Sequence, residues 1–236
     1  MQSYFAEIQR LLSKVCEQEQ EQIESASKII AACFQNGGIL QLFGCGHSHL
    51  LAQDAYYRAG GLVPVRPITI EPLMLHYGAL ASSKNEKDPA FIKKHLENFE
   101  FKKRDVLIVI STSGCNPAPI DAALLGKKAG ITVISLQSLE YREQLSRHKS
   151  GHRLEEVVDL VLNTHIPVGD GILSLHGVQY GPASTVIGSA LLHALFSQVI
   201  ESLDMDRLPV FQSANVSANH SANMALINQY KDRIDF

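Results

Sequence analysis

Three hydroxyl side chains in a row follow an apolar run near the middle of the chain. The run 106–110 contains only Val, Leu and Ile and is typical of a buried strand; after it come Ser111, Thr112, Ser113 and Gly114. Asn116 and a proline follow, a pair that favours the start of a helix. Hydroxyl groups and the free N–H groups of a helix start favour an anion, because the helix dipole adds about half a positive charge there. The pattern predicts a site for a phosphate monoester, with Asn116 among the residues that bind it.

An earlier turn from strand to helix has the same character. Residues 39–43 are typical of a strand, 48–58 of a helix, and the turn between them carries Gly46, His47 and Ser48. Glycine in such a turn can simply ease a sharp corner. Two turns with serine, after two strands of one domain, weaken that simpler interpretation. We expect these three residues to join the phosphate site, with one of the histidines that flank Ser48 pointing into it.

The two turns differ from the common nucleotide-binding loops. The turn at 111–114 contains no lysine, unlike a GxxxxGK[ST] loop. A dinucleotide fingerprint needs a third glycine near position 49, where this chain has His49. Glu71 does follow the next predicted strand, as the acid of that fingerprint would. An NAD(P)-binding enzyme therefore stays an alternative, although the serines disfavour it.

Composition indicates a globular protein and gives no reason to expect a nucleic-acid or membrane partner. Of its 236 residues, 45% are apolar and 19% charged, and the net charge of −3 offers no electrostatic reason for binding nucleic acid. Apolar runs are far shorter than the ~20 residues of a membrane-spanning helix, and the N-terminus lacks the features of a signal peptide. The four cysteines show no paired spacing, which favours a reducing compartment. We expect a cytoplasmic protein that binds neither nucleic acid nor membranes.

Apolar periodicity predicts a helical N-terminus followed by alternating strands and helices. Over 3–36 apolar residues recur every three to four positions, and the polar stretch 17–21 leaves one long helix or two as alternatives. Strands are predicted at 39–43, 62–68, 105–110, 131–136 and 157–163. Helices are predicted at 48–58, 89–99, 117–129, 182–203 and 219–232. The alternation predicts a doubly wound parallel sheet.

Other segments do not fit this alternation. Residues 71–88, 137–156 and 164–181 are expected to form irregular loops, which in a compact domain are usually functional or disordered. The polar stretch 212–223 forms either a helix cap with a solvated loop or a set of amides that reaches, with His220, into a sugar site. The long N-terminal helix has little sheet to cover at its far end, which favours packing against a second subunit.

Together these features resemble the SIS (sugar isomerase) domain. Its double motif corresponds to a strand leading into Gly44-x-Gly46-x-Ser48 and a second strand leading into 111–114, and residues 108–114 are close to the phosphosugar isomerase version. The resemblance covers roughly residues 1–203. The tail, with Ser213-Ala214-Asn215 and His220-x-x-Asn223 before a last helix, resembles a UPF0309-like branch of bacterial SIS proteins, related to phosphoheptose isomerases.

The resemblance implies a single SIS domain over residues 1–236, with a helical extension at 1–36 and a C-terminal tail at 204–236. It implies an α/β, flavodoxin-like fold with five parallel strands. It also implies a phosphate pocket made from Ser48, Ser111, Thr112 and Ser113. Homodimers or homotetramers in which one subunit completes its neighbour's site are a further implication. In the family's phosphosugar isomerases an acid and a histidine share the proton transfer, and some members use zinc.

Aldose–ketose isomerisation needs a base that moves a proton between C1 and C2. Glu71 is the candidate by position, because it follows the second strand and should lie at the carboxyl edge of the sheet; the alternative is a solvated acid. His193 falls near the histidine of the family's late helix; the alternative is a core histidine bonded to backbone. The heptose-phosphate branch carries a His and a Glu four apart in the helix after the first turn, where this chain offers only Asp54.

No cofactor is expected. The Cys and His residues that could converge above the sheet lack C-x-x-C or H-x-x-x-H spacing; they are Cys45, His47, His49, His76, Cys115, His176 and His193. The expected function is a phosphosugar isomerase or an amino-sugar phosphate lyase. A non-catalytic sugar-phosphate sensor is the alternative. SIS regulators carry a DNA-binding domain ahead of the SIS domain, for which residues 1–36 are too few and not basic.

Overall fold

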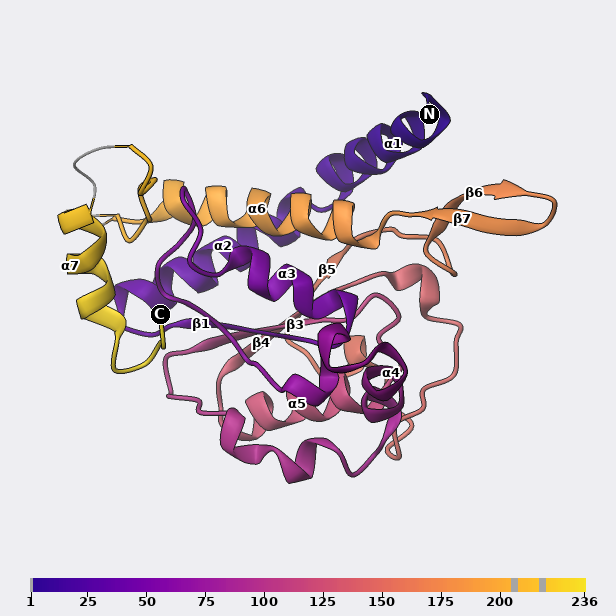
Figure 1. The fold of residues 1–236 in the computed structure, drawn as a ribbon, viewed down its shortest axis with the longest axis horizontal. Helices are drawn as coiled ribbons and strands as arrows, with labels where there is room; N and C mark the ends of the chain where they lie inside the picture. The colour runs from indigo at the N-terminus through magenta and orange to yellow at the C-terminus, as the bar shows by residue number, and fades with distance from the viewer. Residues whose placement is uncertain (1, 205–207, 217–219) are drawn as a thin grey trace.

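A five-stranded parallel sheet forms the centre of the protein (Figure 1). The computed structural model describes residues 2–204, 208–216 and 220–236. The strands, in the spatial order β2-β1-β3-β4-β5, are β1 (Leu40–Gly44), β2 (Val65–Pro67), β3 (Val106–Ile110), β4 (Thr132–Gln137) and β5 (Leu160–Asn163). This order is that of flavodoxin-like folds, so the predicted fold class is confirmed. The five predicted strands are also confirmed, with β2 shorter than expected.

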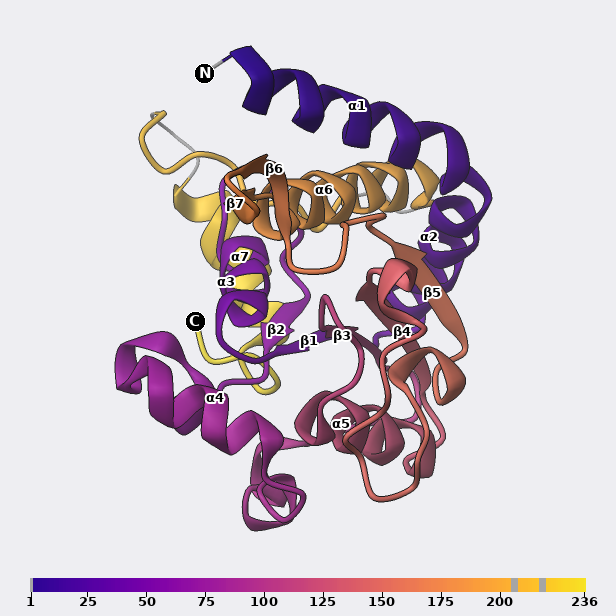
Figure 2. The same cartoon turned by 90° about the vertical axis from the view of Figure 1, so that its right-hand side faces the viewer.

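Helices cover both faces of the sheet, as Figure 2 shows. One face is covered by α1 (Gln2–Gln18), α2 (Gln20–Gln35), α3 (His47–Ala55) and α6 (Ser184–Ser202). The other face is covered by α5 (Pro117–Lys128), and α4 (Ala79–Lys87) packs beside it. Alternate strand residues supply the two cores: Leu42 and Ile108 face the first layer, whereas Phe43 and Val109 face the second. Burial on both faces explains why the strands are continuous apolar runs.

The N-terminal segment forms two helices that break at Glu19, which settles the alternative left open by the sequence. Glu19 is only 5% exposed. Its Oε2 accepts a hydrogen bond from the backbone N–H of Asn163 at 3.0 Å, and its Oε1 lies 2.8 Å from Nε2 of His165. The helix break therefore places a carboxylate against the end of β5 and ties the helical pair to the sheet.

The helix predicted at 89–99 is wrong. Two short 3₁₀ turns occupy residues 92–94 and 96–98, and the α-helix lies earlier, at α4, in a segment expected to be irregular. The carboxylate of Asp88 accepts a hydrogen bond from the N–H of Ala90 at 2.8 Å and starts a tight turn. Phe91 and Ile92 reach the core from this turn instead of from a helical stripe. α4 escaped prediction because Ser82 is its one buried residue.

The irregular loop predicted at 164–181 is also wrong. It contains an antiparallel hairpin of β6 (Gly171–Leu175) and β7 (Val178–Pro182), which projects from the body of the molecule (Figure 1). The two residues of its turn, His176 and Gly177, have φ values of +50° and +78°. A two-residue turn with both residues in this region matches the twist of a hairpin.

The last helix, α7 (His220–Tyr230), confirms the helix predicted at 219–232. Tyr230 and Ile234 pack against Ile39 and Val63, which precede β1 and β2. The described part of the tail thus lies at the amino ends of the strands. None of the described helices is long and apolar enough to cross a membrane.

Candidate functional site

The two turns singled out in the sequence meet in a narrow pocket at the carboxyl edge of the sheet. Its lining comes from the ends of three strands and the starts of two helices. The lining residues are His47, Ser48, Leu51, Ile110, Thr112, Leu136, Gln137, Thr164, Ser184 and Thr185. Ligands bind at this edge in open α/β sheets, where the helix N-termini point.

Glycine makes the first turn possible. A Cβ on Gly44 would lie 2.6 Å from the carbonyl carbon of Ser48, so the backbone of α3 approaches β1 too closely for any other residue. Gly46 has a φ of +56°, and its N–H donates to the carbonyl of Leu73 at 2.8 Å. The turn leaves Ser48 half-buried and His47 exposed, both on the pocket. His49 is buried instead, so His47 is the histidine that faces the pocket.

The second turn holds its carbonyl groups on one side. The carbonyl of Thr112 accepts from the N–H of Ser138 at 3.0 Å, that of Ser113 from Nη2 of Arg153 at 2.7 Å, and that of Gly114 from the N–H of Leu154 at 2.9 Å. Within the described residues, the N–H groups of 112–115 donate to no protein acceptor. Successive free N–H groups in a tight loop form a cradle for an anion.

Not every predicted ligand in this turn lies on the pocket. Thr112 lines it, whereas Ser111 and Ser113 do not. Ser111 is 4% exposed, and its N–H donates to the carbonyl of Leu136 at 3.0 Å. The hydroxyl of Ser113 lies 3.3 Å from Sγ of Cys115. Of the four hydroxyls predicted to converge, the structure therefore brings Ser48 and Thr112 to one pocket.

Asn116 is buried, and it joins a polar network with Glu86, which is half-buried, and Arg147, which is exposed. Its Nδ2 donates to Oε1 of Glu86 at 2.8 Å, and its Oδ1 accepts from Nη1 of Arg147 at 2.7 Å. Burial raises the pKa of Glu86, although the hydrogen bond from Asn116 and the charges of Lys87 and Arg147 act in the opposite direction. The amide of Asn116 is fully engaged by these partners, so it positions the loop.

The two candidate catalytic residues lie apart from each other. Glu71 starts a 3₁₀ turn, is exposed and does not line the pocket. His193 lies on α6, and its Nε2 is 2.8 Å from Oδ2 of Asp54 on α3. Asp54 also accepts from the hydroxyl of Ser189 at 3.2 Å and pairs with Arg58. The acid beside His193 is thus Asp54 and not Glu71.

The ion pairs of Asp54 keep its carboxylate charged. Burial acts to raise the pKa of Asp54, but the hydrogen bond from His193 and the charge of Arg58 outweigh it and lower the pKa. Because the carboxylate accepts the proton on Nε2, Nδ1 of His193 is the basic nitrogen. A partly exposed imidazole oriented by a carboxylate is the arrangement of a general base.

α6 connects this pair to the pocket. Thr185, Ser189 and His193 are spaced by four residues and share one helix face, and the first of them lines the pocket. The eight helical steps from Thr185 to His193 span about 12 Å. The contact between α3 and α6 therefore runs from the pocket toward the Asp54–His193 pair.

Four polar pocket residues were missed in the sequence: Gln137, Thr164, Ser184 and Thr185. Gln137 ends β4, Thr164 directly follows β5, and the other two begin α6. A polar residue at the carboxyl end of a buried strand was the available signal, because such ends meet at one edge of a parallel sheet.

The remaining prediction for this site concerns the C-terminal tail. The side chain of His220 lies outside the part of the chain that the structure describes. Its neighbour Asn223 exchanges two hydrogen bonds with the backbone of Gln212, at 3.0 and 2.8 Å. The participation of His220 in a sugar site stays a prediction.

The metal-ligating residue types do not fit a zinc site. Among the described residues, no group of three or more His, Cys, Asp or Glu side chains is placed to hold a metal ion. Cys45 and Cys115 are both buried and free. Burial and the nearby charge of Glu86 raise the pKa of the Cys45 thiol well above its ordinary value, so it is held as the neutral thiol.

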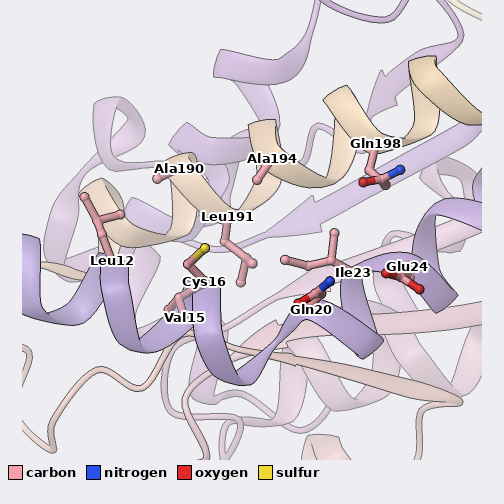
Figure 3. A pocket seen from close by; sticks show the side chains of 10 residues that line it. All are labelled: Leu12, Val15, Cys16, Gln20, Ile23, Glu24, Ala190, Leu191, Ala194 and Gln198. Atoms are coloured by element: carbon pink, nitrogen blue, oxygen red, sulfur yellow. The ribbon is translucent and has the colours of Figure 1, made fainter.

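A larger cavity of about 580 Å³ lies elsewhere, between α6 and the pair α1 and α2 (Figure 3). Leu12, Val15, Ile23 and Leu191 give it an apolar lining, and Glu24 is its one charged residue. A negatively charged side chain repels a phosphate. This apolar groove therefore suits a phosphate less well than the narrow pocket, whose lining is uncharged apart from a histidine.

The family model described as the SIS domain matches residues 3–138. A protein from Lysinibacillus sphaericus named "UPF0309 protein in nagA 3'region" is 53% identical over 238 residues, which covers 100% of this chain and 98% of the relative. This chain belongs to the SIS domain family and, within it, to the UPF0309 proteins. The resemblance stated from the motifs is thereby confirmed.

Solved structures agree with this SIS fold. Phosphoheptose isomerase GmhA from Neisseria gonorrhoeae superimposes with a TM-score of 0.57 at 20% identity, covering 84% of this chain and 95% of that one. The Vibrio vulnificus NanR protein complexed with ManNAc-6P superimposes with a TM-score of 0.52 at 17% identity, covering 85% of this chain and 62% of that one. The neighbours of this UPF0309 protein thus include an isomerase and a protein solved with a sugar phosphate.

Proposed function

We propose that this UPF0309 protein binds a phosphorylated sugar or amino sugar at the carboxyl edge of its sheet. The observation that carries the proposal is the loop 112–115, whose carbonyl groups are held by hydrogen bonds while its N–H groups have no acceptor in the described residues. The hydroxyls of Ser48 and Thr112 line the same pocket. Such a set of uncharged donors suits a phosphate dianion.

Electrostatics support the placement of the phosphate beside the start of α3 and the loop 112–115. No Lys or Arg lines the pocket, so the helix N-termini supply the positive potential. The start of α6 is already neutralised, because Oδ1 of Asp170 accepts the N–H groups of Ala183 and Ser184 at 3.1 and 2.7 Å. The starts of α3 and α5 carry no such carboxylate cap.

For the reaction, we infer an aldose–ketose isomerisation of the bound sugar phosphate. A base takes the proton from C2 and returns it to C1, while a second proton moves between the two oxygens. His193, oriented by Asp54 at 2.8 Å, is the base that the geometry supports best. Glu71 remains the second candidate. It is exposed at the same edge of the sheet.

A non-catalytic sensor and an amino-sugar phosphate lyase are the alternatives. The sensor is supported by the NanR structure solved with ManNAc-6P, which belongs to a protein of the same fold. Both alternatives use the same phosphate pocket. A turnover assay distinguishes the three functions. An isomerase interconverts aldose and ketose phosphates, a lyase eliminates a group such as ammonia from the amino sugar and leaves an unsaturated product, and a sensor leaves its ligand unchanged.

Thermal unfolding with a panel of ligands tests the binding proposal. The panel contains glucose 6-phosphate, sedoheptulose 7-phosphate, N-acetylmannosamine 6-phosphate, the unphosphorylated sugars and NAD. A ligand at 100 times its Kd stabilises by about 2.7 kcal/mol, which raises Tm by about 5–10 °C for a chain of this size. We expect a shift from at least one sugar phosphate and none from its unphosphorylated sugar. A shift from NAD alone would overturn the proposal.

Variants of the pocket sharpen this test. We expect Thr112→Val with Ser48→Ala to abolish the shift, because both substitutions remove pocket hydroxyls without adding bulk. Ser197→Ala is the matched control, since that serine is exposed on α6 outside the pocket. If the double variant shows the same shift in Tm as the wild type, the phosphate does not bind in this pocket.

We further infer that the protein forms homodimers or homotetramers, with a second copy of the chain covering the groove of Figure 3. The groove is apolar, lies at the N-terminal helices and does not suit a phosphate ligand. Sedimentation velocity of the wild type and of Ala194→Arg tests this inference. We expect the wild type to sediment as an oligomer and the variant as a monomer, whereas a monomeric wild type would refute it.

A further inference from the structure

Gln137 presents an unused hydrogen-bond acceptor at the proposed phosphosugar pocket. The residue is 1% exposed and lines the pocket at the end of β4. Its Oε1 is buried and has no hydrogen-bond partner among the described residues. A buried carbonyl oxygen without a partner is costly, and such atoms in native structures call for an explanation.

A chain of hydrogen bonds fixes the orientation of this amide. Nε2 of Gln137 donates to Oε2 of Glu155 at 3.0 Å, and Oε1 of Glu155 accepts from Nε of Arg153 at 2.6 Å. A flipped amide would place its oxygen against the Glu155 carboxylate, where two acceptors repel each other. Glu155 therefore binds the amide nitrogen and leaves the amide oxygen as the atom without a partner.

The same chain of hydrogen bonds connects the amide of Gln137 to the loop 112–115. Arg153 donates through Nη2 to the carbonyl of Ser113 at 2.7 Å. A Cβ on Gly114 would lie 2.7 Å from Oε1 of Gln137 and 3.2 Å from Oε2 of Glu155. The φ of Gly114 is +60°. The free oxygen thus lies directly beside the loop whose N–H groups are unpaired.

We propose that Oε1 of Gln137 accepts a hydrogen bond from a hydroxyl or amide N–H of the bound sugar, close to its phosphate, and that Glu155 and Arg153 are positioning residues for it. This inference rests on the proposed function. An acceptor adds nothing to the binding of the dianionic phosphoryl group of an ester, because its oxygens carry no proton. The pocket therefore selects phosphate esters that bear a donor near the ester, and it disfavours simple alkyl phosphates.

The test compares two probes in two proteins by titration calorimetry. The first probe is the tightest of glucose 6-phosphate, sedoheptulose 7-phosphate and N-acetylmannosamine 6-phosphate, and the second is methyl phosphate, which carries the anion alone. In Gln137→Met, which keeps the side-chain length but has no acceptor, we expect the Kd of the sugar phosphate to rise about tenfold. The Kd of methyl phosphate should stay within about twofold, because its contacts are unchanged.

Two more variants separate orientation from general disruption. In Glu155→Gln the amide of Gln137 is no longer locked, so we expect a rise of about threefold in the sugar-phosphate Kd and no change for methyl phosphate. Gln35→Met is the matched control, because Gln35 is exposed at the end of α2. Both Kd values should remain at the wild-type level in this control.

Ligand analogues keep the test decisive if Gln137→Met does not fold. Monodeoxy derivatives of the same sugar phosphate are titrated into the wild type, and removal of one hydroxyl near the phosphate should raise the Kd about tenfold. In a folded Gln137→Met the same removal should change nothing. A wild type for which no deoxy analogue binds more weakly would overturn the inference.

The outcomes also distinguish the inference from the function beneath it. If the wild type binds neither probe, the proposed function and the inference both fail. If the wild type prefers the sugar phosphate and Gln137→Met keeps that preference, only the role of Gln137 is refuted. An equal weakening of both probes in Gln137→Met refutes it as well, because that result indicates damage to the loop.

Discussion

Oδ2 of Asp54 lies 2.8 Å from Nε2 of His193, across the contact between α3 and α6. The two residues are 139 positions apart in the chain. The pair combines a carboxylate of lowered pKa with an imidazole whose second nitrogen is available as a base. It lies about two turns of helix beyond the residues of α6 that line the narrow pocket.

We expect Asp54→Asn to lower the turnover of a sugar phosphate about 100-fold while its Kd stays within about twofold, because the substitution removes the charge that orients the base but no phosphate ligand. Steady-state kinetics and calorimetry measure the two quantities. Ser197→Ala, on the exposed side of α6, should change neither. If Glu71→Gln abolishes turnover and Asp54→Asn does not, the base is Glu71.

We expect Gly44→Ala to cost about 2–3 kcal/mol of the free energy of unfolding, since its Cβ would meet the backbone of Ser48 at 2.6 Å. Sugar-phosphate binding should weaken with it, because α3 must move away from β1. Gly37→Ala is a useful comparison: its φ is +75°, but nothing lies within 4 Å of the added Cβ. It should cost about 1 kcal/mol. If Gly44→Ala and Gly37→Ala lower the free energy of unfolding equally in urea, the close approach of α3 to β1 is contradicted.

Glu19→Gln should cost about 2–3 kcal/mol of the free energy of unfolding. The carboxylate accepts hydrogen bonds from the N–H of Asn163 and from His165, and an amide can satisfy only one of them with its oxygen. Glu21→Gln, two residues away and exposed, should stay within about 0.5 kcal/mol of the wild type. Urea unfolding measures both changes. If Glu19→Gln leaves the free energy of unfolding unchanged, the buried hydrogen bonds of Glu19 do not stabilise the fold.

Acid should destabilise the protein through His49. Burial, and secondarily the charge of His76, lower the pKa of His49 from 6.5 to about 4. Its Nε2 is buried and finds no hydrogen-bond partner in the part of the chain that the structure describes. The folded state therefore favours the neutral ring. As the pH falls through 6.5 toward 4, the unfolded chain takes up the proton first and stability is lost.

Between pH 7.5 and pH 5 this effect amounts to about 2 kcal/mol. The non-titrating variant His49→Leu should lose that much less stability over this range, as measured by urea unfolding at each pH. His152→Asn is the control, because that histidine is exposed. If wild type and His49→Leu show the same pH dependence, His49 is not held neutral by the fold.

The local sequence pattern was sufficient to predict the sheet and the two turns. The run 106–110 is apolar because both of its faces are buried, and Gly44 and Gly46 stand where close approach and a positive φ exclude side chains. Such properties belong to a few consecutive residues and are visible without a partner. Where the local pattern was weak, as in α4 with its single buried residue, prediction failed.

The chemistry of the site depended on pairs that no local pattern contains. Asn116 carried a binding signal, yet its amide is engaged by Glu86 and Arg147 from two distant segments. Gln137 carried none, yet β4 delivers it to the pocket and Glu155 orients it. Hydrogen-bond partners and burial are set by which segments pack together, and packing is a property of the whole chain. The sequence alone therefore predicts an anion site at the sheet edge, whereas the tertiary structure selects the side chains that face it.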